Sequence, residues 1–75
     1  MEELDRILAE NWPEIDFEKE TALVDDGLFT SLDLVTLVGE LNDAFDIEIT
    51  AEDLLPENFN SAEAIEALVR RLAED

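Results

Sequence analysis

Apolar residues recur at the spacing of an amphipathic helix in three separate stretches of this 75-residue chain. They fall three and four positions apart, so that one face of each helix would be apolar. A chain of this length can bury only one small core. The pattern therefore predicts an all-α fold in a single domain, with main helices over about 2–11, 31–45 and 61–73.

Two other stretches lack this spacing. In residues 46–50, polar and apolar residues alternate as in a strand. Since the chain offers no second strand to pair with, we expect an extended connector. A short fourth helix is predicted over about 51–55 and should end at Pro56, because the residue before a proline disfavours helical conformation. Residues 12–29 are predicted to form a long ordered loop, tied down by Trp12, Ile15, Phe17, Leu23 and Leu28.

The core of this small helical bundle must form by apolar packing alone. The chain has no cysteine, which excludes a disulfide framework and a thiolate metal site. The residues expected in the core are the large apolar ones of the second half of the chain: Leu37, Val38, Leu41, Phe45, Ile49, Leu54, Phe59, Ile65 and Leu68.

The charge balance restricts the partners. The chain has 22 acidic and four basic residues and a net charge of −18. Such a surface repels phosphate backbones and anionic lipids, so we expect no nucleic-acid binding and favour a basic protein partner. No apolar run reaches the roughly 18 residues of a membrane span, and the N-terminus lacks the positive region of a secretory signal. A cytoplasmic location is therefore expected.

Side-chain catalysis has little support in the composition. The chain has no histidine, cysteine or tyrosine, and its one lysine, Lys19, lies among acidic residues that would hold it in an exposed ion pair. Asp-Asp-Gly at 25–27 resembles the middle of an EF-hand calcium loop. Aligning Gly27 with the loop glycine places Ala22 and Val24 where oxygen ligands are needed, so no metal site is predicted.

Ser31 is the hydroxyl with the most unusual position. Thr30 is a good N-cap and Asp33 lies three residues later, so Ser31 would begin the second helix. A phosphate on this hydroxyl would lie near the positive end of the helix dipole. Taken alone, Thr-Ser-Leu-Asp at 30–33 is better explained as a simple helix cap.

The residues around Ser31 favour a functional role for this serine over a simple helix cap. Residues 23–33 read Leu-Val-Asp-Asp-Gly-Leu-Phe-Thr-Ser-Leu-Asp, and the helix that follows ends in Phe45 and an Asp-Ile-Glu-Ile segment. This stretch resembles the attachment region of acyl carrier proteins, in which an acidic loop with a glycine precedes an Asp-Ser-Leu motif. The spacing of Gly27 from Ser31 and the segment at 56–61 resemble the stand-alone D-alanyl carrier proteins.

The resemblance implies that a phosphopantetheinyl transferase attaches 4′-phosphopantetheine from coenzyme A to Ser31. Cargo would be held as a thioester on that arm, loaded by an acyl- or aminoacyl-specific ligase and passed to downstream acyl-transfer enzymes with basic docking surfaces. The residues implied to contact partners are Leu32, Asp33, Glu40 and Asp43. The carrier would be a monomer and not itself an enzyme. Its cargo could be D-alanine, a fatty acyl chain, or a polyketide or peptide intermediate.

One position departs from the family pattern. Thr30 stands where acyl carrier proteins usually have aspartate. Threonine can still cap the helix, but a negative charge beside the serine is lost, which would weaken recognition by a basic transferase. An alternative is therefore a carrier-fold domain that is not modified and acts only as an acidic docking module.

Overall fold

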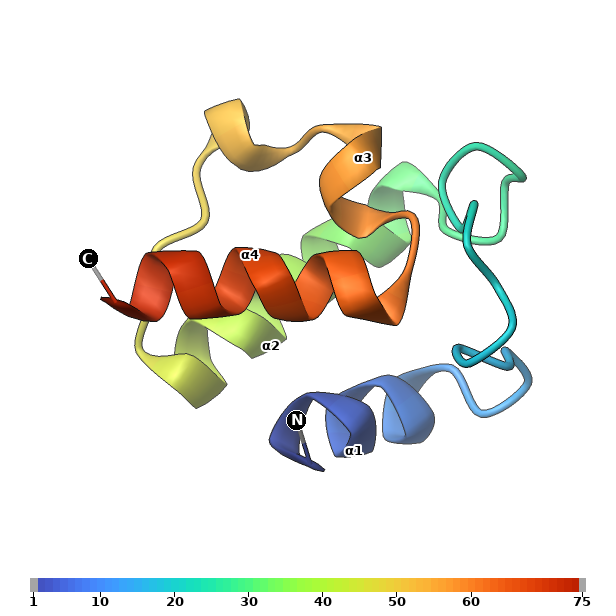
Figure 1. Ribbon diagram of the computed structural model, residues 1–75, viewed down its shortest axis with the longest axis horizontal. Helices are drawn as coiled ribbons and strands as arrows, with labels where there is room; N and C mark the ends of the chain where they lie inside the picture. The colour runs from blue at the N-terminus through green and yellow to red at the C-terminus, as the bar shows by residue number, and fades with distance from the viewer. Residues whose placement is uncertain (1, 75) are drawn as a thin grey trace.

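The computed structural model describes residues 2–74 (Figure 1). Its regular secondary structure over that range consists of helices, with no strand. The chain forms a compact body of 30 × 25 × 19 Å. Its elements, in chain order, are α1 (Glu2–Asn11), α2 (Ser31–Phe45), the 3₁₀ turn η1 (Ala51–Asp53), α3 (Pro56–Phe59) and α4 (Ala62–Glu74). Within residues 2–74, none of the helices has the length and apolar character that a membrane-spanning segment needs.

The second helix has local signals at both of its ends. Thr30 is extended and caps the start of α2 through its side chain, and Asp46 caps the end in the left-handed conformation, with φ of 53°. The Asn42 side-chain oxygen accepts a hydrogen bond from the Ile49 N–H at 2.9 Å. This bond holds the 46–50 connector, which has no strand pairing, against the end of α2.

The segment after the connector corrects the sequence prediction. A helix was expected over 51–55 with Pro56 as its end, but only the three residues of η1 are helical there, and Pro56 instead begins α3. Proline suits the first position of a helix, because its N–H would have no partner there and its φ is already helical. The last helix also begins one residue later than predicted, at Ala62, because the Ser61 hydroxyl accepts the Ala64 N–H at 3.0 Å.

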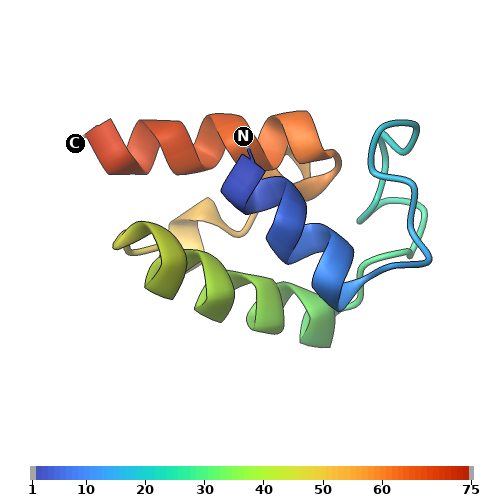
Figure 2. The same cartoon turned by 90° about the horizontal axis from the view of Figure 1, so that it is seen from below.

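The core lies between the three long helices. Figure 2 shows α1 crossing in front of α2 and α4, with η1 and α3 on the far side. Helices α1 and α4 each bury three apolar residues, α2 contributes Leu37 and Leu41, and α3 contributes Phe59. The buried apolar residues are Leu4, Ile7, Leu8, Trp12, Leu23, Phe29, Leu37, Leu41, Ile49, Phe59, Ile65, Leu68 and Val69.

Two expected core contacts are absent. Leu54 is 43% exposed and Leu28 is 39% exposed, although both were predicted to pack inside. The loop is anchored instead by Phe29, whose ring centroid lies 4.9 Å from that of Trp12. Leu28 comes just before the buried Phe29 and faces outward after the turn at Gly27, where φ is +78°. Val38 and Phe45 pack against the core but remain half-buried.

Candidate functional site

Ser31 is the first residue of α2, and the capping box around it explains why the helix begins there. The Thr30 hydroxyl accepts the Asp33 N–H at 3.2 Å, and Asp33 Oδ2 accepts the Thr30 N–H at 3.0 Å. Each side chain thus satisfies a backbone group that the helix leaves without a partner. Thr30 therefore performs the capping role, and Ser31 is placed in the first turn.

The Ser31 side chain is exposed, and no group in residues 2–74 forms a hydrogen bond with its hydroxyl. The neighbouring Thr30 hydroxyl differs, because it also donates to Asp33 Oδ2 at 3.1 Å. The first turn of α2 presents backbone N–H groups and the positive end of the helix dipole, which favour an anion. The serine thus offers an accessible hydroxyl at a position where a phosphate group would be stabilised.

Asp33 joins two parts of the chain that are distant in sequence. Its Oδ1 accepts a hydrogen bond from Trp12 Nε1 at 3.2 Å, while Oδ2 is held by Thr30. Hydrogen bonds from the Thr30 backbone and from the Trp12 indole hold the pKa of the Asp33 carboxyl below its usual value, although partial burial opposes them. Both oxygens are therefore engaged within the chain, and Asp33 ties the end of α1 to the start of α2.

The lowered pKa of Asp33 predicts a pH-dependent contribution to stability. A carboxyl with a depressed pKa in the folded state stabilises the fold above its unfolded pKa of about 3.9. That contribution is lost as the pH falls through the lower folded value. We expect the difference in free energy of unfolding between the wild type and Asp33→Asn to be constant near neutral pH and to shrink below about pH 4. Urea unfolding at a series of pH values measures it, and a difference that does not change with pH would contradict the expectation.

Asn60 holds the loop that leads to Ser31. Its side-chain Oδ1 accepts the N–H groups of Val24 at 2.9 Å and Asp25 at 3.1 Å, and its Nδ2 donates to Asp25 Oδ2 at 3.1 Å. The Asn60 carbonyl oxygen also accepts the Leu23 N–H at 2.8 Å. The junction between α3 and α4 therefore fixes residues 23–25, which lie just before the turn into α2.

Replacing Asn60 with alanine should cost about 2 kcal/mol of stability, because the partly buried N–H of Val24 and the exposed N–H of Asp25 both lose their acceptor. Asn58→Ala is a matched control, since the Asn58 side chain makes one hydrogen bond, to the Asp53 carbonyl oxygen at 2.8 Å. We expect it to cost roughly half as much. Urea unfolding of both variants measures the difference, and equal losses would argue against a special role for Asn60.

An apolar surface surrounds Ser31. Leu32 and Val35 on α2 are 75% and 67% exposed, and Leu54 and Leu55, which follow η1, are 43% and 46% exposed. A groove of about 370 Å³ adjoins the serine, lined by Ser31, Leu34, Val35, Val38 and Leu54. Of these four residues, only Leu32 was predicted at the site, and Leu54 was predicted in the core. The one signal available for Leu54 and Leu55 was Pro56, which follows them directly and begins α3.

The structure does not bring all the proposed docking residues together. Glu40 and Asp43 are exposed on α2, nine and twelve residues beyond Ser31 and so roughly 14 and 18 Å along the helix. Asp43 lies about three full turns after Leu32, so the two residues share one face of α2. Glu40 lies about two and a half turns after Ser31, so it is on the opposite face of the helix from the serine. Asp33 lies two residues after Ser31, but its carboxylate is engaged by Thr30 and Trp12.

Comparison with known proteins agrees with this arrangement. Residues 2–72 match the family described as phosphopantetheine attachment site. The chain is 40% identical over 63 residues to aminoacyl carrier protein 1 of Bradyrhizobium diazoefficiens, an alignment that covers 84% of this chain and 69% of the relative. No solved structure was found to match the chain.

The helical fold with a serine at the start of α2, together with the family match, defines a carrier domain. This class of protein holds a group for other enzymes and is not itself catalytic. The chain belongs to the acyl carrier protein family, whose members carry covalently attached 4′-phosphopantetheine and work with phosphopantetheinyl transferases. The site fits that group, since an exposed hydroxyl lies at a helix start beside an apolar groove.

Proposed function

We propose that this chain carries an aminoacyl or acyl group as a thioester on a 4′-phosphopantetheine arm attached to Ser31. The observation that carries the proposal is the exposed Ser31 hydroxyl in the first turn of α2, next to a threonine hydroxyl that the capping box engages. The arm supplies a thiol to a chain that has no cysteine. The chain's own part is to hold the arm's phosphate at the helix start and to present the cargo.

The cargo proposed first is an aminoacyl group. The relative from Bradyrhizobium is named an aminoacyl carrier protein, and the sequence resembles the D-alanyl carriers. The groove beside Ser31 has four apolar lining residues and no charged one. It therefore suits the apolar part of a cargo or arm, while the ammonium of an aminoacyl group would stay in water.

The surface proposed for partner enzymes is the exposed apolar set around Ser31, with acidic groups at its edge. Leu32 and Val35 supply apolar contact area, and Asp43 lies on the outward face of α2. A loading ligase or transferase with basic residues would be attracted by the charge and bound by the apolar contacts. Glu40 and Asp33 contribute mainly to the negative electrostatic potential that attracts such a partner. The monomeric state and the cytoplasmic location remain predictions from the sequence.

The test is a mass measurement. The unmodified protein is incubated with coenzyme A, magnesium and a broad-specificity phosphopantetheinyl transferase and is then weighed. We expect a gain equal to one phosphopantetheine, with the added mass on the peptide that contains Ser31. An unchanged mass with several transferases would refute the proposal and favour the unmodified docking module.

A further inference from the structure

A second groove lies on the side of the molecule where α1 crosses α2 and α4. It has a volume of about 570 Å³ and is formed by α1, residues 12–18 of the loop and the start of α4. It shares no lining residue with the groove beside Ser31. The groove beside Ser31 is lined by α2 and Leu54 instead, and α1 and the η1–α3 segment lie on opposite sides of α2 and α4 (Figure 2).

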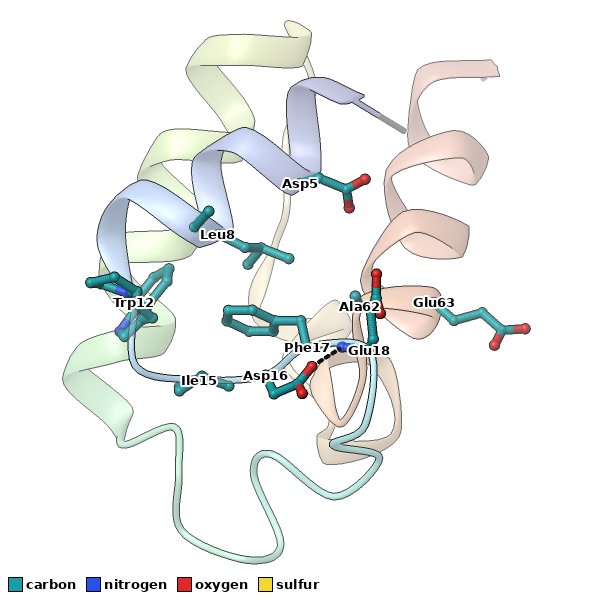
Figure 3. Close-up of a pocket in the computed structure, with 11 residues that line it drawn as sticks. Asp5, Leu8, Trp12, Ile15, Asp16, Phe17, Glu18, Ala62 and Glu63 are labelled. Carbon is teal, nitrogen blue, oxygen red and sulfur yellow. Dashed lines mark hydrogen bonds between the residues drawn. The ribbon is translucent and has the colours of Figure 1, made fainter.

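The groove combines an apolar floor with an acidic rim. Leu8, Trp12 and Phe17 lie together on the α1 side, and Glu18 and Glu63 lie toward α4 (Figure 3). Of its eleven lining residues, four are acidic and none is basic. A ligand that fits must therefore bring an apolar part for the floor and positive charge for the rim.

The acidic rim is compensated only in part: Asp5 has an interaction partner and Asp16 is paired with Lys19, whereas Glu18 and Glu63 form no ion pair within residues 2–74. Each of the four basic residues already lies within 4.0 Å of a carboxylate. Lys19 is the one close to the groove, and it is paired with Asp16 at 4.0 Å and is 84% exposed. A second copy of the chain would bring another 18 negative charges, so repulsion disfavours self-association here.

We propose that this groove is a docking site for a basic, partly apolar segment of a partner protein. Arginine or lysine side chains of the segment would pair with Glu18 and Glu63 at the rim, and its apolar side chains would cover Ile15 and Phe17. Because the groove is separate from the surface around Ser31, a partner held here leaves the serine open to other enzymes.

Trp12 makes the proposal measurable without a label. It is the one tryptophan of the chain, lines the groove and is 7% exposed. The unmodified protein is titrated with a short tryptophan-free peptide of alternating leucine and arginine while Trp12 emission is recorded. We expect a saturable change in emission. A change that does not saturate, or no change, would overturn the proposal.

Matched variants separate a specific site from attraction to the net charge. The double variant Glu18→Gln and Glu63→Gln should bind the peptide about tenfold more weakly, since two exposed ion pairs are lost. Glu48→Gln with Glu52→Gln removes the same charge from exposed positions outside the groove and should change binding less than about twofold. Equal weakening by the two double variants would overturn the proposal.

Two further measurements test the floor and the occupant. A peptide of alternating glycine and arginine keeps the charge but lacks apolar side chains, and it should bind at least about fivefold more weakly. Equal binding would show that charge alone is recognised. Sedimentation should find a monomer, and a dimer that the leucine–arginine peptide dissociates would assign the groove to a second copy instead. None of these results depends on modification of Ser31.

Discussion

A Ser31→Ala chain should stay folded and gain no mass when it is incubated with coenzyme A, magnesium and a phosphopantetheinyl transferase. The Ser31 hydroxyl takes part in no hydrogen bond within residues 2–74, so its removal leaves the capping box between Thr30 and Asp33 intact. Alanine is also the best helix former at an exposed position. The loss of modification should therefore be complete while the unfolding curve hardly changes.

The matched control is Ser61→Ala. Ser61 is also at the start of a helix, but its hydroxyl is already used, since it accepts the Ala64 N–H at 3.0 Å. This variant should lose about 1 kcal/mol of stability with its cap and should still gain one phosphopantetheine. Mass spectrometry with circular dichroism on both variants measures the contrast. A mass gain in Ser31→Ala would place the attachment on another side chain.

Replacing Phe59 with alanine should remove a large part of the chain's free energy of unfolding. Phe59 is fully buried and is the anchor of α3, a helix of four residues. Such a truncation costs about 3–5 kcal/mol in lost burial and in the cavity left behind. A 75-residue domain has a total stability of roughly 4–11 kcal/mol. The loss is thus a large part of what holds the fold together.

The effect should also reach the loop that leads to Ser31. Asn60, which follows Phe59 directly, holds residues 23–25 by hydrogen bonds. Leu55→Ala in the same segment is the control, since Leu55 is 46% exposed, and it should cost less than about 1 kcal/mol. Thermal and urea unfolding measure both variants. A Phe59→Ala loss as small as that of Leu55→Ala would contradict the assigned role of α3.

Prediction from the sequence worked where the controlling interactions are local. The bounds of α2 follow from apolar spacing and from the contact of Thr30 with Asp33, which are three residues apart. The same reasoning failed between 51 and 59. A proline that ends one element there also begins the next, and a four-residue helix is too short to show a period.

The candidate site was predicted in part for the same reason. Ser31 could be placed at a helix start from its neighbours alone, but the exposure of Leu54 and the burial of Phe29 could not. In loops, adjacent apolar residues carry no periodic signal that says which one faces inward. Only the packing of Phe29 against Trp12 settled which side of the loop entered the core.

The spacing of apolar residues and the cap at Thr30 thus determined by themselves an all-α chain with a serine opening its central helix. These features depend on contacts between residues three or four positions apart, and such contacts can be predicted from the sequence directly. Only the tertiary structure shows that Trp12 forms a hydrogen bond with Asp33, 21 residues away. The same holds for the hydrogen bond between Asn60 and Val24, which are 36 residues apart. Such bonds form only after the helices have packed, because packing is what brings their donors and acceptors within reach.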